Sequence, residues 1–296
     1  FGNHNLSSKY LEIAKDLDPN LFSKDPDYIL YNSNYSPNMS AEDIFECYKK
    51  YNQKFGLPLQ KKWKPFPHIK EAKNKLKIGY VSPDFKKHSA QNFLLPTLAH
   101  HDHQKFKIYA FAEILKEDLV TKQYQSLVDN WIPTQGLTDQ EMDDKIRNLE
   151  IDVLVDLAGH TNGNRLGVFA RKPAPISITW LGYGYTTGLT AIDYFLSDEV
   201  IAPKGVEHLF SEKIWRLSNY GFCCYQAKKD MGIVCPLPAL EKGYITFGTL
   251  TRAIRINDKV INVWCEILKR VKHSKLIINS KSFKNLIVVE DFKKRF

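Results

Sequence analysis

The chain has 296 residues, of which 43% are hydrophobic and 25% charged, so it is long enough to bury a core and too apolar to be disordered throughout. No apolar run approaches the roughly 18–20 residues that a membrane span requires, and no signal peptide is visible at the first residues. The formal net charge of +9 comes mostly from thinly spread Lys, so we expect no nucleic-acid or membrane partner, and the charge equally suits a phosphate-bearing ligand.

Residues 1–70 are predicted to be a helical N-terminal segment and linker. Ser40-Ala-Glu-Asp43 is a capping box, and it predicts a helix that runs through Phe55 and ends at Gly56. The stretch 23–39 before it is polar, so we expect only one clear helix in this segment. The apolar residues that recur at helical spacing are Ile44, Phe45, Tyr48, Tyr51 and Phe55.

Residues 71–240 alternate between strand and helix patterns. A helix is predicted over 91–101, and a second capping box, Thr138-Asp-Gln-Glu141, begins another. Four apolar stretches read as strands: 76–81, 106–111, 151–157 and 176–180. Such alternation predicts an α/β class and a doubly wound, Rossmann-like parallel sheet covered on both faces.

Residues 241–296 contain one further strand–helix–strand pattern, over 244–247, 258–271 and 275–279. A lone two-stranded parallel unit cannot cover its own sheet, so we expect the sequence to be cut short here. The helix residues expected to point inward are Val260, Ile261, Trp264, Ile267 and Leu268.

Three predicted strands run into loops rich in Gly, His, Asn and Thr, at 82–89, 156–165 and 180–188. In doubly wound sheets ligands bind beyond the carboxyl ends of the strands, where these loops must lie. None of them is a dinucleotide fingerprint, a Walker loop, a nucleophile elbow or a zinc-binding helix. The residues alone therefore predict a cleft lined by His and Gly, without a reaction.

Longer runs of sequence carry a resemblance to one family. They are KIGYVSPDFKKHS (77–89), IDVLVDLAGHTNGNRLGVFARKPAPISITWLGY (151–183), TTGLTAIDY (186–194), SEK (211–213) and FGTLTRAIRINDKVINVWCEILKRV (247–271). From about residue 30 to the end, the chain resembles the O-linked N-acetylglucosaminyltransferases, including bacterial members and the plant SPINDLY-type O-fucosyltransferases.

The resemblance implies a GT-B fold of two Rossmann-like domains, preceded by tetratricopeptide repeats. Residues 71–240 would be the N-terminal catalytic domain, and 241–296 the truncated start of the domain that binds the nucleotide sugar. The implied reaction is inverting transfer of a sugar from a nucleotide diphosphate sugar to Ser or Thr hydroxyl groups of proteins. The resemblance also implies that the reaction needs no metal or other cofactor. The UDP-sugar is counted as a co-substrate.

The resemblance also assigns site residues. His88 matches the cleft histidine beside the acceptor, as base or positioning residue, although it could instead cap the nearby helix. His160 matches a catalytic or ligand-contacting position and could equally hold its loop, while Arg255 falls on the lysine that contacts the diphosphate. Further substrate or donor contacts are expected at Asp84, Arg165, Trp180, Tyr183, Thr186, Thr187 and Gly188.

Two features of the sequence leave open questions. Gly184 and Tyr185 replace the Pro and Gly of the family's usual loop, which puts the local turn in doubt. Asp156 ends a buried strand and would need partners there, for which Arg165 is a candidate.

The five cysteines have spacings that fit neither a disulfide framework nor a zinc site, so we expect reduced thiols, no metal site and a cytoplasmic location. The expected donor is UDP-N-acetylglucosamine, with glucose or fucose donors as alternatives. This chain alone is expected to be inactive, and a non-catalytic module that binds peptide or sugar is the other alternative.

Overall fold

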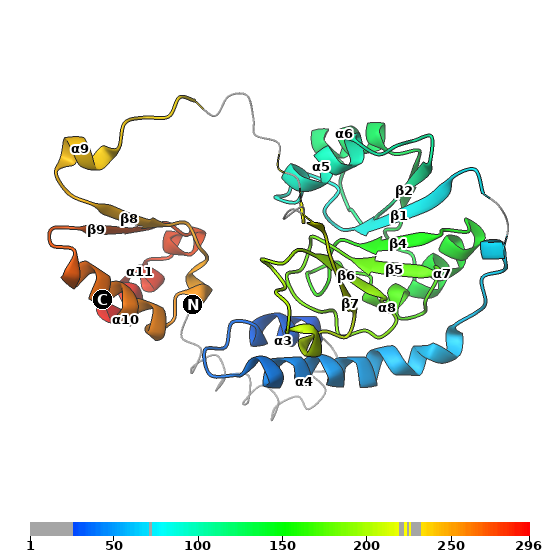
Figure 1. Cartoon of the computed structure of the whole chain (residues 1–296), viewed down its shortest axis with the longest axis horizontal. Coiled ribbons are helices and arrows are strands. Elements are labelled where there is room, and N and C mark those ends of the chain that lie inside the picture. Colours follow the sequence, from blue (N-terminus) through cyan, green and yellow to red (C-terminus); the bar gives the residue numbers. More distant parts are fainter. Residues whose placement is uncertain (1–25, 71–72, 219–221, 224, 226–231) are drawn as a thin grey trace. The chain divides into compact units, whose positions relative to one another are not determined.

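A parallel sheet of seven strands, in the order β3-β2-β1-β4-β5-β6-β7, organises the larger of two units in the chain (Figure 1). The computed structural model describes residues 26–70, 73–218, 222–223, 225 and 232–296. Of these, the larger unit contains Pro26–Tyr31 and most of Ser40–Ala227, and the smaller unit contains Asn32–Met39 and the residues from 232 to the end.

All four strands predicted for the larger unit are present, and every pairing in the sheet is parallel, which confirms the α/β prediction. The strands are β1 (Leu76–Ser82), β2 (Phe106–Ala112), β3 (Asn130–Pro133), β4 (Val153–Asp156), β5 (Ile176–Thr179), β6 (Tyr194–Ser197) and β7 (Lys213–Arg216). The helices are α3 (Pro26–Ser33), α4 (Ala41–Tyr51), α5 (Gln91–Ala99), α6 (Leu119–Leu127), α7 (Asp139–Asn148) and α8 (Leu166–Phe169).

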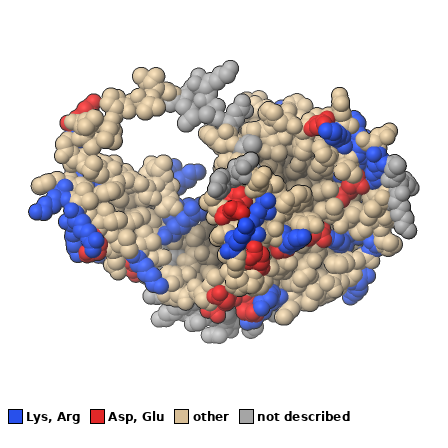
Figure 2. Space-filling view, viewed as in Figure 1, with Lys and Arg blue, Asp and Glu red and all other residues tan. Residues whose placement is uncertain are grey.

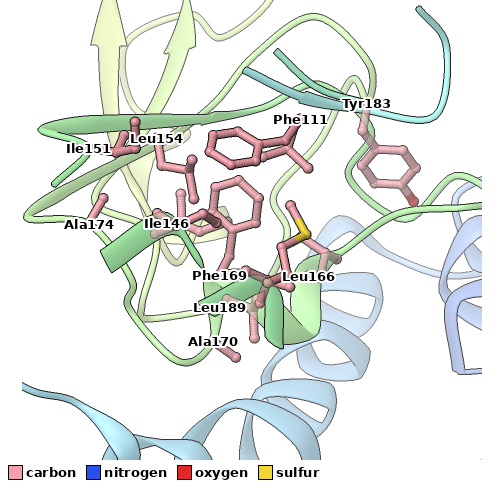
Figure 3. Packing of buried hydrophobic residues seen from close by; sticks show 14 of the residues in the cluster. Phe111, Ile146, Ile151, Leu154, Leu166, Phe169, Ala170, Ala174, Tyr183 and Leu189 are labelled. Carbon is pink, nitrogen blue, oxygen red and sulfur yellow. The ribbon is translucent and has the colours of Figure 1, made fainter. Parts of the chain in front are cut away.

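The sheet separates two apolar cores, because successive side chains of a strand point to opposite faces. On β1, Tyr80 belongs to one core and Val81 to the other; on β4, Val155 and Leu154 divide in the same way. Residues of α5 and α6 fill the core around Tyr80, and residues of α4, α7 and α8 fill the core around Val81 (Figure 3).

The N-terminal segment corrects two predictions. The capping box of Ser40 and Asp43 is formed, but the helix does not end at Gly56: it continues as a π-helix (Asn52–Gly56) and a 3-10 helix (Leu57–Lys62). Gly56 is closely packed inside this helical stretch, because a Cβ at this position would lie only 2.2 Å from Oδ1 of Asn52. Pro58 occupies the first turn of the 3-10 helix, where its missing N–H removes no helical hydrogen bond.

The polar stretch before α4 contains a helix that was not predicted, α3, which begins at Pro26. Leu30 of α3, with Tyr48 and Tyr51 from α4, is buried in the same core as Phe111 and Ile146. The helical segment is therefore part of the packing of the larger unit, as far as the described residues show it.

The smaller unit has the predicted strand–helix–strand order: β8 (Thr246–Thr249), α10 (Asp258–Arg270) and β9 (Lys275–Ile278). It also contains α9 (Pro238–Lys242) and α11 (Leu286–Arg295). Ile261 is buried as expected, whereas Ile267 is 37% exposed, so the predicted inward face of α10 is only partly covered. The small core consists of Ala253, Ile256, Ile261, Val288 and Phe292.

None of the helices in the described part of the chain has the length and apolar character needed to cross a membrane. On the face that Figure 2 shows, the described Lys and Arg side chains stand in small separate groups, several of them beside acidic side chains.

Candidate functional site

Three loops meet at the carboxyl edge of the large sheet. They are the β1 loop (residues 83–90), the β4 loop (157–165) and the β5 loop (180–190), and they follow strands that are neighbours in the sheet. Their approach is close, because a Cβ built at Gly163 would lie only 2.9 Å from Cβ of Pro83. The strand order reverses direction between β1 and β4, and ligands of doubly wound sheets bind at such a switch point.

His88 lies in the β1 loop with its side chain 46% exposed. Its Nδ1 accepts a hydrogen bond from the Ala90 N–H (3.3 Å) at the start of α5, and it lies 3.6 Å from Oδ2 of Asp84. An accepting Nδ1 leaves the proton of the neutral ring on Nε2. α5 has no side-chain cap, so the hydrogen bond of the His88 ring reaches only the residue that precedes the helix, and this half-exposed ring lies in the loop at the carboxyl edge of the sheet.

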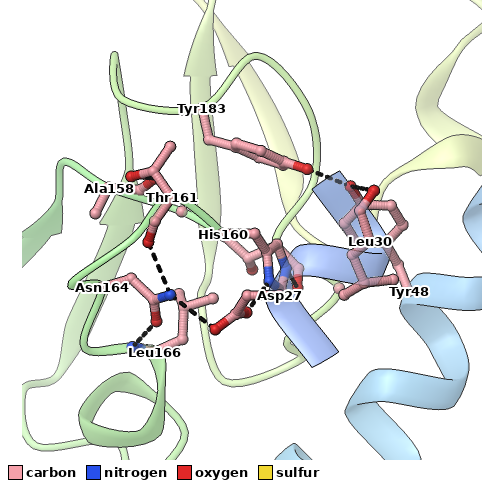
Figure 4. A network of polar contacts seen from close by, with 12 residues as sticks. Asp27, Leu30, Tyr48, Ala158, His160, Thr161, Asn164, Leu166 and Tyr183 are labelled. Atoms are coloured by element: carbon pink, nitrogen blue, oxygen red, sulfur yellow. Dashed lines mark hydrogen bonds and ion pairs between the residues drawn. The ribbon is translucent and has the colours of Figure 1, made fainter. Parts of the chain in front are cut away.

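His160, in the β4 loop, has a fully buried side chain whose two ring nitrogens are both bonded (Figure 4). Nδ1 lies 2.5 Å from Oδ1 of Asp27, which comes from α3, and Nε2 lies 2.8 Å from the carbonyl oxygen of Thr187 in the β5 loop. The rings of Tyr48, Tyr51 and Tyr183 face the imidazole in edge-on contacts. No ring atom of His160 is open to a ligand in this arrangement.

Thr186 and Thr187 are fully buried and bonded to Glu212. The Thr186 hydroxyl donates to Oε2 of Glu212 (2.5 Å), and the N–H of Thr187 donates to Oε1 (2.8 Å); the Thr187 hydroxyl also donates to that carboxylate. Burial raises the pKa of Glu212 above its ordinary value of 4.5, against the effect of these donors. Both hydroxyl groups expected at a ligand therefore point into the protein.

Three other residues of the β5 loop are also set by packing. Trp180 is buried and donates from Nε1 to the carbonyl oxygen of Phe222 (2.8 Å). The buried Tyr183 hydroxyl lies 2.6 Å from that of Tyr48. Gly188 has a φ of +78°, and a Cβ there would lie 2.7 Å from the carbonyl oxygen of Tyr48, so only glycine fits. The β5 loop is pressed directly against α4.

Asp156 and Arg165 do not pair, which corrects the expected partnership. The Asp156 carboxylate accepts hydrogen bonds from the N–H groups of Ala158 (3.0 Å) and Gly159 (2.9 Å) and from the hydroxyl of Thr179 (2.8 Å). Burial raises the pKa of this carboxyl.

Arg165 forms ion pairs elsewhere in the larger unit. Its guanidinium lies 3.2 Å from Oε2 of Glu113 and 3.2 Å from Oδ1 of Asp139, and it donates to the carbonyl oxygen of Leu137 (2.8 Å). The charge is thus already balanced within the protein.

The departure at positions 184 and 185 has a structural counterpart. Gly184 is exposed, with no atom within 4 Å of a Cβ built there. The ring of Tyr185 makes edge-on contacts with Tyr48 (5.1 Å between centroids) and Phe210 (5.2 Å). Burial raises the pKa of Tyr185 to about 12. This tyrosine ties the loop to α4 and to the segment before β7.

Arg255 belongs to the smaller unit, where it ends a 3-10 turn (Ala253–Arg255) after β8. It is exposed, and its guanidinium lies 5.9 Å from the centroid of the Tyr35 ring. Nearby, Lys259 donates to the carbonyl oxygen of Pro37 (2.7 Å). Within the described part of the chain, no carboxylate pairs with Arg255, so its charge is available to an anion.

Sequence reasoning missed Asp27, Tyr48 as a hydrogen-bonding residue, and Glu212. Pro26 followed by an acidic residue is a helix-start signal that could have revealed α3. Glu212 lies within the SEK run that carried the resemblance, but nothing in the sequence indicated its burial. Among the described residues, no group of three or more His, Cys, Asp or Glu side chains is placed to hold a metal ion.

The sequence of the chain is similar to those of known glycosyltransferases. The sequence profile of Glycosyl transferase family 41 matches residues 53–229. The chain is 35% identical over 254 residues to a probable UDP-N-acetylglucosamine–peptide N-acetylglucosaminyltransferase SPINDLY of Solanum lycopersicum; the match covers 84% of this chain and 27% of the relative. It is 28% identical over 238 residues to the corresponding SEC protein of Arabidopsis thaliana, which covers 75% of this chain and 24% of the relative.

The solved structure of an O-GlcNAc transferase point mutant from Thermobaculum terrenum matches with a TM-score of 0.90 at 26% identity, over 99% of this chain and 55% of that one. This match confirms the expected GT-B-type fold class. The chain spans about a quarter of the length of the curated relatives. With a family profile matching more than half of its residues, the chain belongs to glycosyl transferase family 41.

Proposed function

We propose that this chain supplies the acceptor side of an inverting, metal-independent transferase that moves N-acetylglucosamine from UDP-N-acetylglucosamine to Ser or Thr hydroxyl groups of proteins. The observation that carries the proposal is the half-exposed imidazole of His88 at the switch point between β1 and β4. Of the two histidines expected to be catalytic, only His88 has a ring that a substrate can reach. The printed names of the relatives, which combine this donor with a peptide acceptor, support the substrate classes.

In the proposed reaction the acceptor hydroxyl oxygen forms a bond to the anomeric carbon of the sugar, while the bond from that carbon to the diphosphate oxygen breaks. The hydroxyl proton must leave the acceptor as the new bond forms. His88 can take it at Nε2 once the ring adopts the other tautomer, with the proton on Nδ1 facing Asp84. If the present tautomer persists, His88 instead orients the hydroxyl oxygen by donating from Nε2.

The leaving diphosphate needs positive charge and oriented donors, because electrostatic stabilisation of developing charge is a large term in catalysis. Arg255 supports this role, since it is exposed and has no acidic partner among the described residues. Its planar fork suits phosphate oxygens.

The test is transfer by the protein at its full natural length, with UDP-N-acetylglucosamine, UDP-glucose and GDP-fucose each offered with a Ser/Thr peptide. Transfer from UDP-N-acetylglucosamine that His88→Ala slows would support the proposal. Transfer from another donor would keep the reaction and change the sugar. Peptide or sugar binding without any transfer would identify a non-catalytic module and overturn the proposal.

A further inference from the structure

We propose that Asp27 is a positioning residue that holds the β5 loop through a doubly protonated His160. The inference rests on the proposed function only in taking the β5 loop as part of the acceptor site. Asp27 lies in the first turn of α3, 133 positions before His160, and no resemblance in the sequence assigned it a role. Together the two side chains connect α3, the β4 loop and the β5 loop (Figure 4).

The hydrogen bonds of the ring support the proposed double protonation. The carbonyl oxygen of Thr187 can only accept, so Nε2 of His160, at 2.8 Å, must carry a proton. An ionised carboxylate can also only accept, so Nδ1, at 2.5 Å from Oδ1 of Asp27, carries a second proton. The proposed pair is thus an ionised Asp27 and an imidazolium at His160, and a cation has no lone pair with which to act as a base.

The second oxygen of Asp27 strengthens the same connection. Oδ2 accepts a hydrogen bond from Nδ2 of Asn164 (2.9 Å), whose Oδ1 in turn accepts from the N–H of Leu166 (3.1 Å) at the start of α8. Both carboxylate oxygens are thus used by the segment that begins with the β4 loop. An acidic side chain in the first turn of α3 is also favoured by the helix dipole.

The surroundings of the ring favour a paired cation. The titratable groups that face it are the carboxylates of Asp27 and Asp156 and the phenols of Tyr48, Tyr51 and Tyr183. No second cation is among these described neighbours. A buried charge with a partner and full hydrogen bonding is tolerated, whereas removal of the partner leaves an uncompensated charge that must be lost.

Thr187 is held by two different side chains, His160 and Glu212. Its carbonyl oxygen accepts from His160, and its N–H and hydroxyl donate to Glu212. The hydroxyl group of Thr187 in turn fixes a backbone amide further along the loop, because it accepts a hydrogen bond from the N–H of Leu189 (3.2 Å). Loss of the Asp27 charge should change the Nε2–H bond to Thr187 from a charge-assisted to a neutral hydrogen bond, so the loop should be held less tightly.

The experiment measures the ring nitrogens of His160 by NMR with ¹⁵N-labelled histidine, on the whole chain. At neutral pH we expect both ring nitrogens of His160 to carry protons in the wild type. Asp27→Asn, which keeps the size and removes the charge, should convert the ring to a neutral tautomer with one N–H. Asp102→Asn is the matched control, since Asp102 is an exposed carboxylate that pairs with Lys105.

The second readout is amide hydrogen exchange in the β5 loop. The change from a charge-assisted to a neutral hydrogen bond corresponds to about a tenfold rise in local opening, so we expect exchange at Leu189 to rise by about that factor in Asp27→Asn. Exchange at Ile108, in the centre of β2, should be unchanged.

A neutral His160 in the wild type overturns the proposal, even if the variant fails to fold. Unchanged exchange at Leu189 in a variant that has lost the second ring proton would overturn the positioning role. Neither readout depends on glycosyl transfer, so failure of the proposed function leaves this test intact.

Discussion

The hydroxyl groups of Tyr48 and Tyr183 lie 2.6 Å apart in the core, although 135 positions separate them in the sequence. The Tyr48 hydroxyl also lies 3.4 Å from the carbonyl oxygen of Leu30, to which it can donate. A hydrogen bond thus joins α4 to the β5 loop.

We expect Tyr48→Phe and Tyr183→Phe each to lower the free energy of unfolding by about 0.5–1.5 kcal/mol. Because both substitutions remove the same bond, the double variant should lose less than the sum of the two. Urea unfolding of the four proteins in this cycle measures the difference. Strict additivity would mean that the two hydroxyl groups do not interact in solution.

Glu212→Gln should lower the free energy of unfolding by about 1–3 kcal/mol, because an amide group would turn a donor toward the Thr186 and Thr187 hydroxyl groups. The effect should also depend on pH. The pKa of Glu212 is raised by burial, so the folded state binds its proton more tightly than the unfolded state does, and stability falls as pH rises above about 4.5 through the folded pKa.

The advantage of the wild type over Glu212→Gln should therefore shrink as pH rises from about 4.5, as measured by urea unfolding at a series of pH values. An advantage that grows with pH would show that the hydrogen-bond donors outweigh burial and that the pKa lies below its ordinary value.

Gly188→Ala should cost more stability than Gly136→Ala, although the two glycines have similar φ values of +78° and +83°. Both substitutions carry the backbone strain of the left-handed region, about 1–2 kcal/mol. Only the Cβ at position 188 meets another atom, the Tyr48 carbonyl oxygen at 2.7 Å, which should add about 1–3 kcal/mol. Equal losses in thermal or urea unfolding would show that α4 can move away from the loop.

The sequence was sufficient for β1, β2, β4 and β5, because their apolar, largely β-branched or aromatic stretches carry a signal of their own. β3 and β7 are as short as β4 and β5, but they mix apolar residues with polar ones or Pro and so carry no clear strand pattern. β6 (Tyr194–Ser197) was not predicted although it is largely apolar. These segments become strands because their backbone groups form hydrogen bonds with a neighbouring strand. Such pairing exists only in the assembled sheet and leaves no mark in the local sequence.

For the candidate site, too, one part could be predicted from the sequence and another could not. The predicted strands were sufficient to place the three loops together at the carboxyl edge of the sheet. The roles of single residues depend on burial and on distant partners, as for Glu212 with Thr187 and for Asp27 with His160. No spacing in a sequence reports such a contact.

His88→Ala in the full-length protein should slow protein glycosylation by about 10²–10⁴-fold if the histidine moves a proton, and by less if it only orients the hydroxyl group. Affinity for UDP, measured by calorimetry, should stay nearly unchanged. His103→Ala is the control, since His103 is a half-exposed histidine that pairs with Asp129. A parallel loss of UDP affinity would assign His88 to the donor.

A related substitution separates the two roles of His88. Asp84→Asn removes the charge that faces Nδ1 at 3.6 Å and that would favour a proton there. If His88 acts as a base, the rate should fall and the acidic limb of the pH–rate profile should change. An unaltered profile would favour the orienting role, in which Nε2 keeps its proton.

Arg255→Ala should lower turnover by about 10²-fold or more and weaken UDP binding, because it removes a charge that meets the diphosphate. Arg255→Lys should retain most of the activity, since the charge remains. Arg270→Ala, at the far end of α10, is the control on the same unit. Full activity of Arg255→Ala would show that another group meets the diphosphate.

The presence of a separate apolar core on each face of the large sheet has a consequence for the evolution of the sequence. Tyr80 and Val81 are joined by a peptide bond, yet they pack in different cores. A volume lost at Val81 can be refilled only from its own side of the sheet, for example by Met142 or Leu166, and a volume lost at Tyr80 only by residues such as Leu94. Compensating substitutions should therefore pair positions far apart in the chain, and neighbours along each strand should drift independently.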